Sequence, residues 1–295
     1  MKKIAVIVNG KKRFSSRINR MIELLKMEHT VQVMTTEYSG HAVDLAIDAC
    51  GAANLLVAAG GDGTLNEVVN GICASGKSTT LSVYPCGNGN DFATAMGIGK
   101  HPEKFVAMIR KNCVREIDVG VVTNDEGKKF FINIASIGIG GYVAQKINEA
   151  GGVLKYPRLI VEGFFRMKKA EVVIRWGDSK VQALVLTAAF CNGTTFANGL
   201  VIQPDARLDD GLLHSCLIGD VSVGEYVKNL RRLKKGRKLN HPKVGYGFGE
   251  KYTIELIDGE CHIETDGEYF GMCPAVFEIE KEKISFVVPE EVAGS

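Results

Sequence analysis

The sequence predicts two domains: an α/β domain with a doubly wound, mostly parallel sheet, and a mainly antiparallel β-sandwich. Up to about residue 118, short apolar runs alternate with segments of helical spacing, which is typical of a parallel sheet. From about 119 to 285, strand-like runs dominate, and Asp-Gly pairs separate several of them, as in antiparallel hairpins. We therefore place the α/β domain at 1–118, completed by 286–295, and the β-sandwich at 119–285.

The first domain is built from four apolar strands, each followed by a helix. Strands are expected at Ile4–Val8, Thr30–Thr35, Leu55–Ala59 and Leu81–Tyr84. Helices are expected around Ile18–Leu25, at His41–Cys50, at Leu65–Cys73, after residue 91, and at Pro102–Lys111, where proline opens the helix. Ligands of such sheets bind at the C-terminal ends of the strands.

The second domain contains seven expected strands with two or three helices among them. The strands are Phe130–Ile137, Ala170–Trp176, Val181–Phe190, Leu212–Ile218, Tyr252–Ile257, Cys261–Thr265 and Ala275–Ile279. Asp-Gly pairs at 210–211, 258–259 and 266–267 predict hairpin turns. A last strand, Ile284–Val288, is expected to return to the first domain.

Composition limits the classes of function. A net charge of +2 over 295 residues does not favour nucleic acid as a partner. The eight cysteines form no C-x-x-C pair, which favours free thiols in a reducing cytoplasm. The apolar run in Met1–Val8 is too short for a signal peptide, and no stretch approaches the ~18 apolar residues of a membrane span. Any membrane contact is therefore expected to be peripheral.

A glycine loop follows the third expected strand, at Gly60–Thr64. Glycines let the backbone approach an anion closely, and amides at the following helix start point toward it. Asp62 within this loop would repel a bare phosphate, but it suits a phosphate that carries a divalent cation. The pattern predicts a nucleoside triphosphate site with Mg²⁺. A simpler interpretation is a capping box, with Thr64 as the N-cap and Glu67 reaching back.

A second glycine loop, Gly87–Asp91, follows the fourth strand. Because neighbouring parallel strands end at one edge of a sheet, the two loops are expected to grip one nucleotide from both sides. The simpler interpretation is a loop in which Asp91 caps a short helix.

The two loops together resemble a known family. Gly60–Thr64 with Asn66-Glu67, followed by Pro85-x-Gly-x-x-Asn-Asp-Phe-Ala93, is similar to the diacylglycerol kinase catalytic domains of soluble lipid kinases, which include sphingosine and ceramide kinases. The resemblance continues through segments 131–135, 204–211 and 265–268, so it spans nearly the whole chain. It implies an ATP-binding first domain, a β-sandwich second domain, and an active site in the cleft between them.

The resemblance also implies roles for individual residues. Asp62 and Asp91 are implied in catalysis with ATP and Mg²⁺. The implied nucleotide-binding residues are Asn9, Thr36, Gly60, Gly61, Asp62, Gly63, Thr64, Glu67, Gly87, Asn90 and Glu268.

Asp266, in the late Asp-Gly-Glu motif, matches the proposed general base of the family. An ionised aspartate, with an ordinary pKa of ~3.9, is ready to accept a hydroxyl proton at neutral pH. The alternative is that Asp266 only forms a hairpin turn. A second, structural Mg²⁺ is implied at Asp210, with backbone carbonyls near Arg207 and Leu212.

The chain departs from the family pattern at several positions. Asn9 is followed by Gly10-Lys11-Lys12 instead of a proline and a Ser/Gly stretch, which leaves open whether Lys11, Lys12 or Lys155 contacts phosphate. Asn88 and Thr94 stand where the family usually has a hydroxyl residue and an arginine. We expect these changes to affect details of the substrate more than the class of reaction.

The segment Lys228–Lys243 carries eight basic residues and no acidic one. An apolar stripe precedes and enters it, which is typical of a solvated surface helix. The functional alternative is a patch that binds an anionic membrane, at about 1 kcal/mol for each basic residue. The segment 159–166 is a second candidate contact, or else a core helix.

We therefore expect an ATP- and Mg²⁺-dependent lipid kinase, with diacylglycerol as the default acceptor, that is cytoplasmic and peripherally membrane-associated. A sphingoid base, another glycerolipid or a polyprenol stays open as acceptor, as does a homodimer. The rivals are an NAD kinase-like enzyme, a sugar kinase, and a nucleotide- or lipid-binding protein without turnover.

Overall fold

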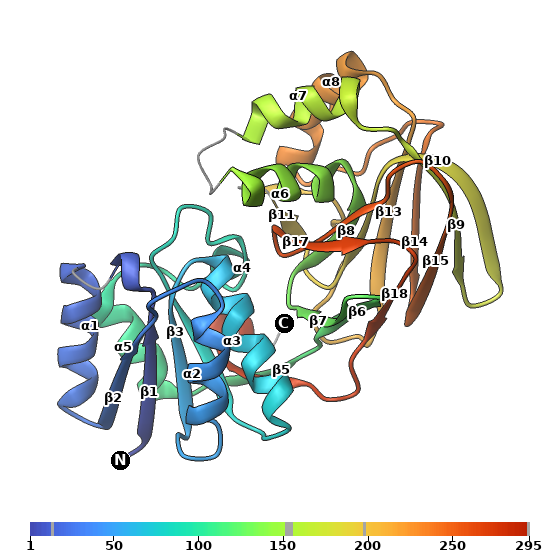
Figure 1. The fold of residues 1–295 in the computed structure, drawn as a ribbon. Helices are drawn as coiled ribbons and strands as arrows, with labels where there is room; N and C mark the ends of the chain where they lie inside the picture. Colours follow the sequence, from blue (N-terminus) through green and yellow to red (C-terminus); the bar gives the residue numbers. More distant parts are fainter. Residues whose placement is uncertain (13–14, 151–155, 197–198, 294–295) are drawn as a thin grey trace. The chain divides into compact units, whose positions relative to one another are not determined.

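The computed structural model describes residues 1–12, 15–150, 156–196 and 199–293. The chain divides into two compact units (Figure 1). The first unit comprises Met1–Ile117 and Glu282–Ser295, and the second comprises Asp118–Lys281. The divisions predicted from the sequence, after residues 118 and 285, lie close to these bounds.

The first unit contains one sheet of six strands, in the order β2-β1-β3-β4-β19-β5. The strands are β1 (Lys3–Val8), β2 (Thr30–Thr35), β3 (Leu55–Gly60), β4 (Thr80–Pro85), β5 (Val114–Ile117) and β19 (Ile284–Val287). The helical segments are η1 (Gly10–Lys12), α1 (Ser16–Lys26), α2 (His41–Ala49), α3 (Asp62–Ser75), α4 (Asp91–Ala95), α5 (Pro102–Lys111) and α9 (Glu290–Ala293).

The sheet of the first unit is parallel apart from its last pair, β19 with β5. Helices α1 and α5 pack together, as do α2 and α3 (Figure 1). All six residues of β3 are buried, as expected for a central strand of an α/β sheet. The predicted α/β fold class is confirmed, and the expected return strand is β19.

The second unit combines strands with helices that lie outside the sheet. Its strands are β6 (Gly120–Asn124), β7 (Gly127–Phe131), β8 (Ile134–Gly138), β9 (Ala170–Trp176), β10 (Ser179–Cys191), β11 (Thr195–Phe196), β12 (Leu200–Val201), β13 (Leu213–Gly219), β14 (Val244–Gly249), β15 (Lys251–Asp258), β16 (His262–Thr265), β17 (Glu268–Met272) and β18 (Ala275–Ile279). Its described helices are α6 (Ile139–Glu149), α7 (Tyr156–Arg166) and α8 (Val223–Lys234).

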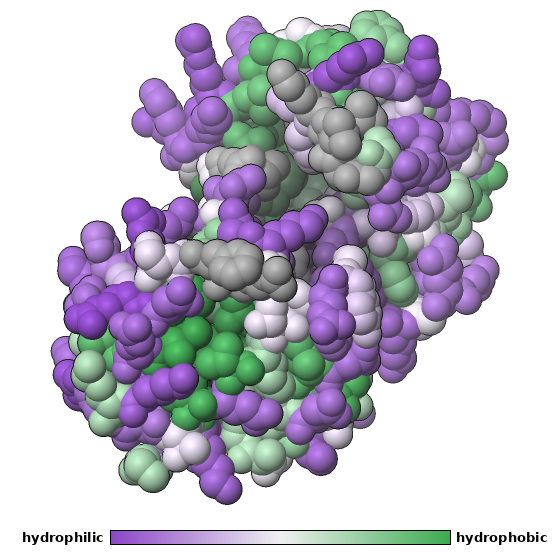
Figure 2. Space-filling model, turned by 60° about the vertical axis from the view of Figure 1, so that its left-hand side comes forward, coloured by the Kyte–Doolittle hydropathy of each residue, from purple (hydrophilic) through white to green (hydrophobic). Residues whose placement is uncertain are grey.

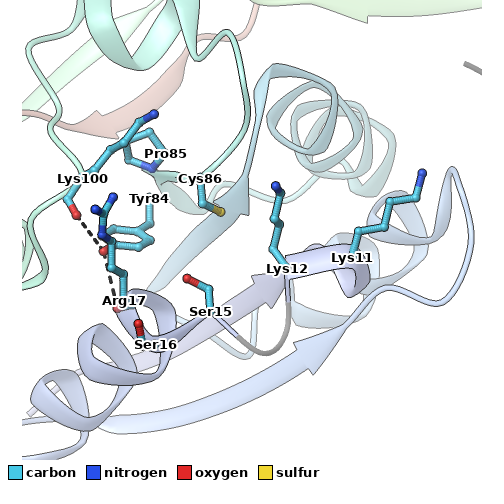
Figure 3. Close-up of a pocket in the computed structure, with 9 residues that line it drawn as sticks. All are labelled: Lys11, Lys12, Ser15, Ser16, Arg17, Tyr84, Pro85, Cys86 and Lys100. Atoms are coloured by element: carbon cyan, nitrogen blue, oxygen red, sulfur yellow. Dashed lines mark hydrogen bonds between the residues drawn. The ribbon is translucent and has the colours of Figure 1, made fainter. Parts of the chain in front are cut away.

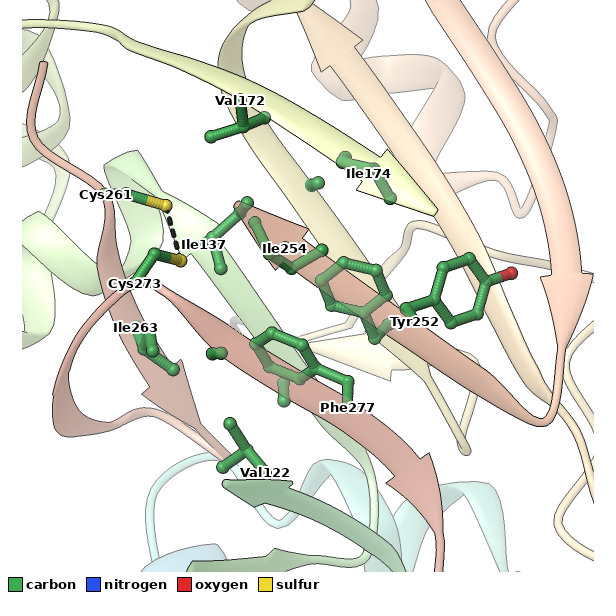
Figure 4. Close-up of a cluster of buried hydrophobic side chains, with 14 of the residues drawn as sticks. Val122, Ile137, Val172, Ile174, Tyr252, Ile254, Cys261, Ile263, Cys273 and Phe277 are labelled. Atoms are coloured by element: carbon green, nitrogen blue, oxygen red, sulfur yellow. Dashed lines mark hydrogen bonds between the residues drawn. The ribbon is translucent and has the colours of Figure 1, made fainter. Parts of the chain in front are cut away.

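Within the described residues, eleven of these strands form one antiparallel sheet, along the path β17-β16-β8-β10-β9-β15-β18-β6-β7 with β13 and β14 added beside β10. The sheet curls around one core, because side chains from distant strands of the path meet there (Figure 4). Val122, Ile263 and Phe277 are among them, and all three are buried. A second apolar cluster lies between the sheet and α6, α7 and α8. This arrangement confirms the predicted antiparallel sandwich.

Two local predictions for the second unit were wrong. The single strand expected at Phe130–Ile137 is two strands, because the chain leaves β7 after Phe131 and enters β8 at Ile134 beside different neighbours. The Asp-Gly pairs at 210–211 and 258–259 are not hairpin turns, since β15 pairs with β9 and β18 and not with β16. Only the pair at 266–267 turns a hairpin, between β16 and β17.

The packing of Phe277 allows a direct test of the core. Its fully buried ring stacks on Phe190, with the ring centroids 4.3 Å apart. We expect Phe277→Ala to lower the free energy of unfolding of the second unit by about 3–5 kcal/mol. Urea unfolding followed by the fluorescence of Trp176, the single tryptophan, measures this.

Phe248→Ala is the matched control, because its ring is 65% exposed in the same unit. We expect a change below about 0.5 kcal/mol. Equal losses in the two variants would contradict a core centred on Phe277.

Candidate active site

The first glycine loop connects β3 to α3 and belongs to the first unit. Helix α3 begins at Asp62, three residues before the expected Leu65, with Gly61 as its N-cap. Thr64 is therefore inside the first turn, where its hydroxyl accepts a hydrogen bond from the Asn9 side chain at 3.0 Å. The capping box considered from the sequence is absent here, since Thr64 is not the N-cap.

The second glycine loop lies directly against the first. A Cβ placed on Gly87 would be 2.5 Å from the Cα of Gly61, so only glycine fits this contact. Asn90 closes the second loop, because its side chain accepts from the Gly87 amide and donates to the Gly87 carbonyl, each at 2.8 Å. Asn90, at φ 57°, is also the N-cap of α4, a place that the sequence had suggested for Asp91.

The two loops and the end of β1 surround a cavity of about 350 Å³. It is lined by Asn9, Lys11, Lys12, Gly61, Gly63, Thr64, Gly87 and Asn88. Five residues predicted for nucleotide binding thus meet at one place, with two lysines beside them. Lys155, the third lysine considered, lies outside the described residues.

Asp62 is the first residue of α3 and Asp91 is the first residue of α4. The amide of Phe92, which follows Asp91, donates to the Asp62 carboxylate at 3.3 Å. Both side chains are partly exposed. Each carboxylate is an oxygen donor of the kind that Mg²⁺ prefers, and Mg²⁺ usually keeps several waters as well.

Thr36 and Glu67, also predicted for nucleotide binding, are not among the residues that line this cavity. The Thr36 hydroxyl accepts a hydrogen bond from the Gly10 amide at 3.0 Å and so holds the turn after β1. The Glu67 carboxylate accepts from the amides of Gly40 and Ala42 at 3.0 and 3.1 Å. Glu67 therefore caps the start of α2, instead of reaching back along its own helix.

In the second unit, Asp266 occupies the hairpin turn between β16 and β17. Asp266 and Gly267 have φ values of 49° and 87°, as a two-residue type I′ turn requires. The Asp266 carboxylate accepts hydrogen bonds from the amides of Ile132, Asn133 and Ile134 at 2.9–3.1 Å. These amides belong to the segment that separates β7 from β8. The turn and the strand break therefore depend on one carboxylate.

Glu268 was expected at this site, whereas sequence reasoning missed two other charged residues around the hairpin, Lys129 and Glu264. Glu268 pairs with Lys129 of β7 at 2.9 Å. Glu264 is buried two residues before Asp266 and accepts from the Ser136 hydroxyl at 2.6 Å and the Gly267 amide at 2.7 Å. Burial raises the pKa of Glu264 to about 7, against the effect of these two hydrogen bonds. The sequence signal that could have pointed to Glu264 is its spacing, because it stands two residues before Asp266 as a third acidic residue beside Glu268.

The side chains of the segment implied for a structural Mg²⁺ have partners within the protein, and the implied backbone carbonyls near Arg207 and Leu212 stay a prediction. Asp210 accepts the Leu212 amide at 3.1 Å and pairs with the His214 ring at 2.9 Å. Arg207 forms an ion pair with Asp209 at 3.5 Å. The buried carboxylate of Asp118 accepts a hydrogen bond from the Gly211 amide at 2.7 Å and anchors the segment. In the part of the chain that the structure describes, no group of three or more His, Cys, Asp or Glu residues could hold a metal ion.

Comparison with known proteins assigns the family. Residues 3–122 match the family described as the diacylglycerol kinase catalytic domain. Residues 118–288 match the YegS C-terminal NAD kinase beta sandwich-like domain. A diacylglycerol kinase of Staphylococcus epidermidis is 30% identical over 99% of this chain and 93% of its own length. The chain belongs to the bacterial soluble diacylglycerol kinase family.

One further relative is similar in sequence, and two solved structures are similar in fold. A Bacillus subtilis diacylglycerol kinase is 28% identical over 99% of this chain and 98% of its length. The crystal structure of a Bacillus anthracis diacylglycerol kinase has a TM-score of 0.75 at 20% identity, covering 98% of both chains. An Archaeoglobus fulgidus NAD kinase in complex with ATP has a TM-score of 0.57 at 12% identity, covering 99% of this chain and 96% of that one. Family membership makes the chain a kinase-type transferase that acts on lipid.

The raised pKa of Glu264 predicts a pH dependence of stability. The folded state holds the Glu264 proton more tightly than the unfolded state, so this contribution is full below about pH 4.5 and is lost as pH rises through about 7. Across this range of pH, the contribution of Glu264 to the free energy of unfolding falls by on the order of 3 kcal/mol. We expect Glu264→Gln to flatten the decline in the free energy of unfolding between pH 5 and 8, measured with urea and Trp176 fluorescence.

Glu250→Gln serves as the control, because Glu250 is an exposed carboxylate of the same unit. Its pH profile should follow that of the unchanged protein. A Glu264→Gln profile parallel to the unchanged one would contradict the assignment.

Proposed function

We propose that this protein transfers the γ-phosphate of ATP to the hydroxyl of a membrane lipid, with diacylglycerol as the first candidate. The cavity formed by the two glycine loops carries the proposal, because it combines open backbone with two lysines, and Asp62 stands between two of the glycines that line it. The relatives in Staphylococcus and Bacillus that match along the whole chain bear the name diacylglycerol kinase. The Archaeoglobus NAD kinase of similar fold was crystallised with ATP.

In this proposal the first unit binds and orients the triphosphate. Gly61, Gly63 and Gly87 allow the phosphates to approach the backbone, and Lys11 and Lys12 offset their charge. Asp62 and Asp91 would hold Mg²⁺, which offsets charge between the phosphate oxygens. Asn9 keeps the Thr64 hydroxyl in a fixed direction.

The proton of the acceptor hydroxyl needs a base, for which we propose Asp266. The lipid oxygen attacks the γ-phosphorus, the bond to the ADP oxygen breaks, and the hydroxyl proton passes to the Asp266 carboxylate. Its hydrogen bonds to the amides of residues 132–134 fix the direction of the carboxylate. The Lys129–Glu268 ion pair holds the strand that follows the turn.

The first test is transfer of labelled γ-phosphate from ATP with Mg²⁺ to a panel of acceptors. Mixed micelles would offer diacylglycerol, phosphatidylglycerol, ceramide, sphingosine and polyprenol, with NAD in parallel. We expect label in diacylglycerol. Label in NAD alone would overturn the lipid assignment, and label in none with ATP still bound would favour a binding protein.

Substitutions separate the two proposed roles. We expect Asp62→Asn and Asp266→Asn each to lower turnover by at least about 100-fold, while Asp266→Asn keeps its affinity for ATP. Asp258→Asn is the control, because Asp258 is also in an Asp-Gly pair but is exposed, where it pairs with Lys168 and the Gly259 amide. If Asp266→Asn keeps full turnover, Asp266 is not the base.

A lipid acceptor requires contact with a bilayer, and we propose that α7 and α8 make it. The described residues contain no helix long and apolar enough to cross a membrane. Helices α7 and α8 adjoin through the rings of Phe164 and Tyr226, whose centroids are 5.3 Å apart. Val161, Phe165 and Val227 are exposed on this pair, with Phe165 at 78%. Hydrophobic and hydrophilic residues lie side by side at the top of the molecule, where these helices are (Figure 2).

Helix α8 also supplies positive charge to this surface. Leu233 is buried, and with Tyr226 and Leu230 it packs into the apolar cluster between the sheet and the helices. The interpretation as a surface helix held by its apolar stripe therefore accounts for the inner face of α8. Arg231, Arg232 and the other basic residues of segment 228–243 point outward and are mostly exposed. Lys238 is bound to Asp205. Exposed apolar side chains beside cations suit an anionic membrane surface.

Vesicle co-sedimentation tests this contact. We expect binding to rise with the content of anionic lipid and fall with salt, and Arg231→Glu/Arg232→Glu to weaken it by at least about 30-fold. Lys128→Glu/Lys180→Glu makes the same change of charge at other exposed positions of the second unit and should bind normally. Equal binding by both variants would refute the role of α8.

A further inference from the structure

A second cavity of the first unit is not explained by the proposed nucleotide site. It measures about 440 Å³, within the range of small-molecule sites. It lies between the start of α1 and the end of β4 (Figure 3). The lining residues are Lys11, Lys12, Ser15, Ser16, Arg17, Tyr84, Pro85, Cys86 and Lys100. It shares only the two lysines with the cavity of the glycine loops.

The lining carries four cations and no carboxylate. Within the described residues, none of the side chains of Lys12, Arg17 and Lys100 takes part in an ion pair or a hydrogen bond, and the same holds for Lys11. Other basic residues of this unit do have partners, such as Arg20 with Glu103 and Arg110 with Glu28. Cations gathered around a cavity without counter-charges form a site of strongly positive potential.

The start of α1 adds hydrogen-bond donors to this positive cavity. Its N-cap, Ser15, makes no side-chain capping bond, and the first turn contains no acidic residue. An eleven-residue helix thus presents an uncapped positive end beside the four cations.

The floor of the cavity is fixed. The Tyr84 hydroxyl donates to the carbonyl of Lys100 at 3.0 Å and lies 3.5 Å from that of Arg17, so it ties together the backbones that carry two of the cations (Figure 3). Cys86 lies between Lys12 and the pair Arg17 and Lys100. Burial raises the pKa of the Cys86 thiol to about 11, so the thiol adds no negative charge at neutral pH.

We propose that this cavity is an anion site that binds a phosphomonoester group, beside the nucleotide cavity, with Arg17 and Lys100 as its own cations and Lys11 and Lys12 shared between the two. A phosphomonoester has a charge of about −1.5 to −2 and three acceptor oxygens, which matches several cations and free helix amides better than a carboxylate does. The group has two sources, a soluble phosphate ester or the headgroup of phosphatidic acid. The site does not depend on which acceptor the kinase uses.

Cys86 provides a readout that does not require activity. N-ethylmaleimide alkylation of Cys86 at pH 8.5 would be followed by peptide mass spectrometry, with the partly exposed Cys73 and Cys113 as internal references. We expect glycerol 3-phosphate to slow alkylation of Cys86 at least fivefold and to leave both references unchanged. Glycerol, and potassium chloride of equal ionic strength, should have no effect.

Charge variants test whether the basic side chains of this cavity are needed for the protection of Cys86. We expect Arg17→Gln/Lys100→Gln to abolish it, since both side chains are exposed and their removal leaves the fold intact. Lys3→Gln/Lys26→Gln removes two exposed charges at the far ends of β1 and α1 and should keep the protection. The ratio with and without ligand is compared within each variant, because Lys100 itself influences the Cys86 thiol.

The outcomes are decisive. Protection by vesicles with phosphatidic acid at far lower phosphate concentration than by glycerol 3-phosphate supports the site and assigns the lipid source. Protection by glycerol 3-phosphate alone supports it and assigns the soluble source. No protection by either, or protection by ADP but not by phosphomonoesters, overturns the proposal.

Discussion

The second unit depends on one carboxylate that replaces a missing stretch of β-ladder. Between β7 and β8 the chain changes partners, and the amides of residues 132–134 point toward the hairpin turn instead of a strand. Asp266 accepts all three. Buried amides without acceptors are costly, so this carboxylate allows the sheet to turn its corner and curl around the core. Asp266 therefore has a structural role in the sheet, and the same hydrogen bonds fix its carboxylate in the way that the proposed role as a base requires.

The first unit has a corresponding constraint, the contact between Gly61 and Gly87. Two strand ends come together only because neither loop has a side chain at that point. The cavity above them is lined by backbone, which adapts to phosphate oxygens through N–H groups. Glu67 and Thr36 support the neighbouring turns, so the residues around the loops stabilise a shape more than they contact a ligand.

The sequence predicted the fold class because apolar periodicity and loop glycines are local signals. It placed β2, α5, β9 and β18 at the bounds that the structure has. The sequence predictions failed where the local structure depends on a contact with a residue far away in the chain. The division of 130–137 follows from Asp266, more than 130 residues further on. Glu264 was missed because its burial depends on β8, where Ser136 donates to it. Glu67 was considered as a cap of its own helix, but it accepts amides at the start of α2, which the local sequence does not show.

The return of β19 has a consequence for how the chain folds during synthesis. β19 fills the position between β4 and β5, yet it follows the whole second unit in the chain. While the ribosome makes residues 118–281, the sheet of the first unit has a gap in its interior, with apolar strands exposed on both sides of it. The second unit is continuous in sequence and is released complete before that gap closes. Folding of the first unit therefore finishes last, although most of its sequence is made first.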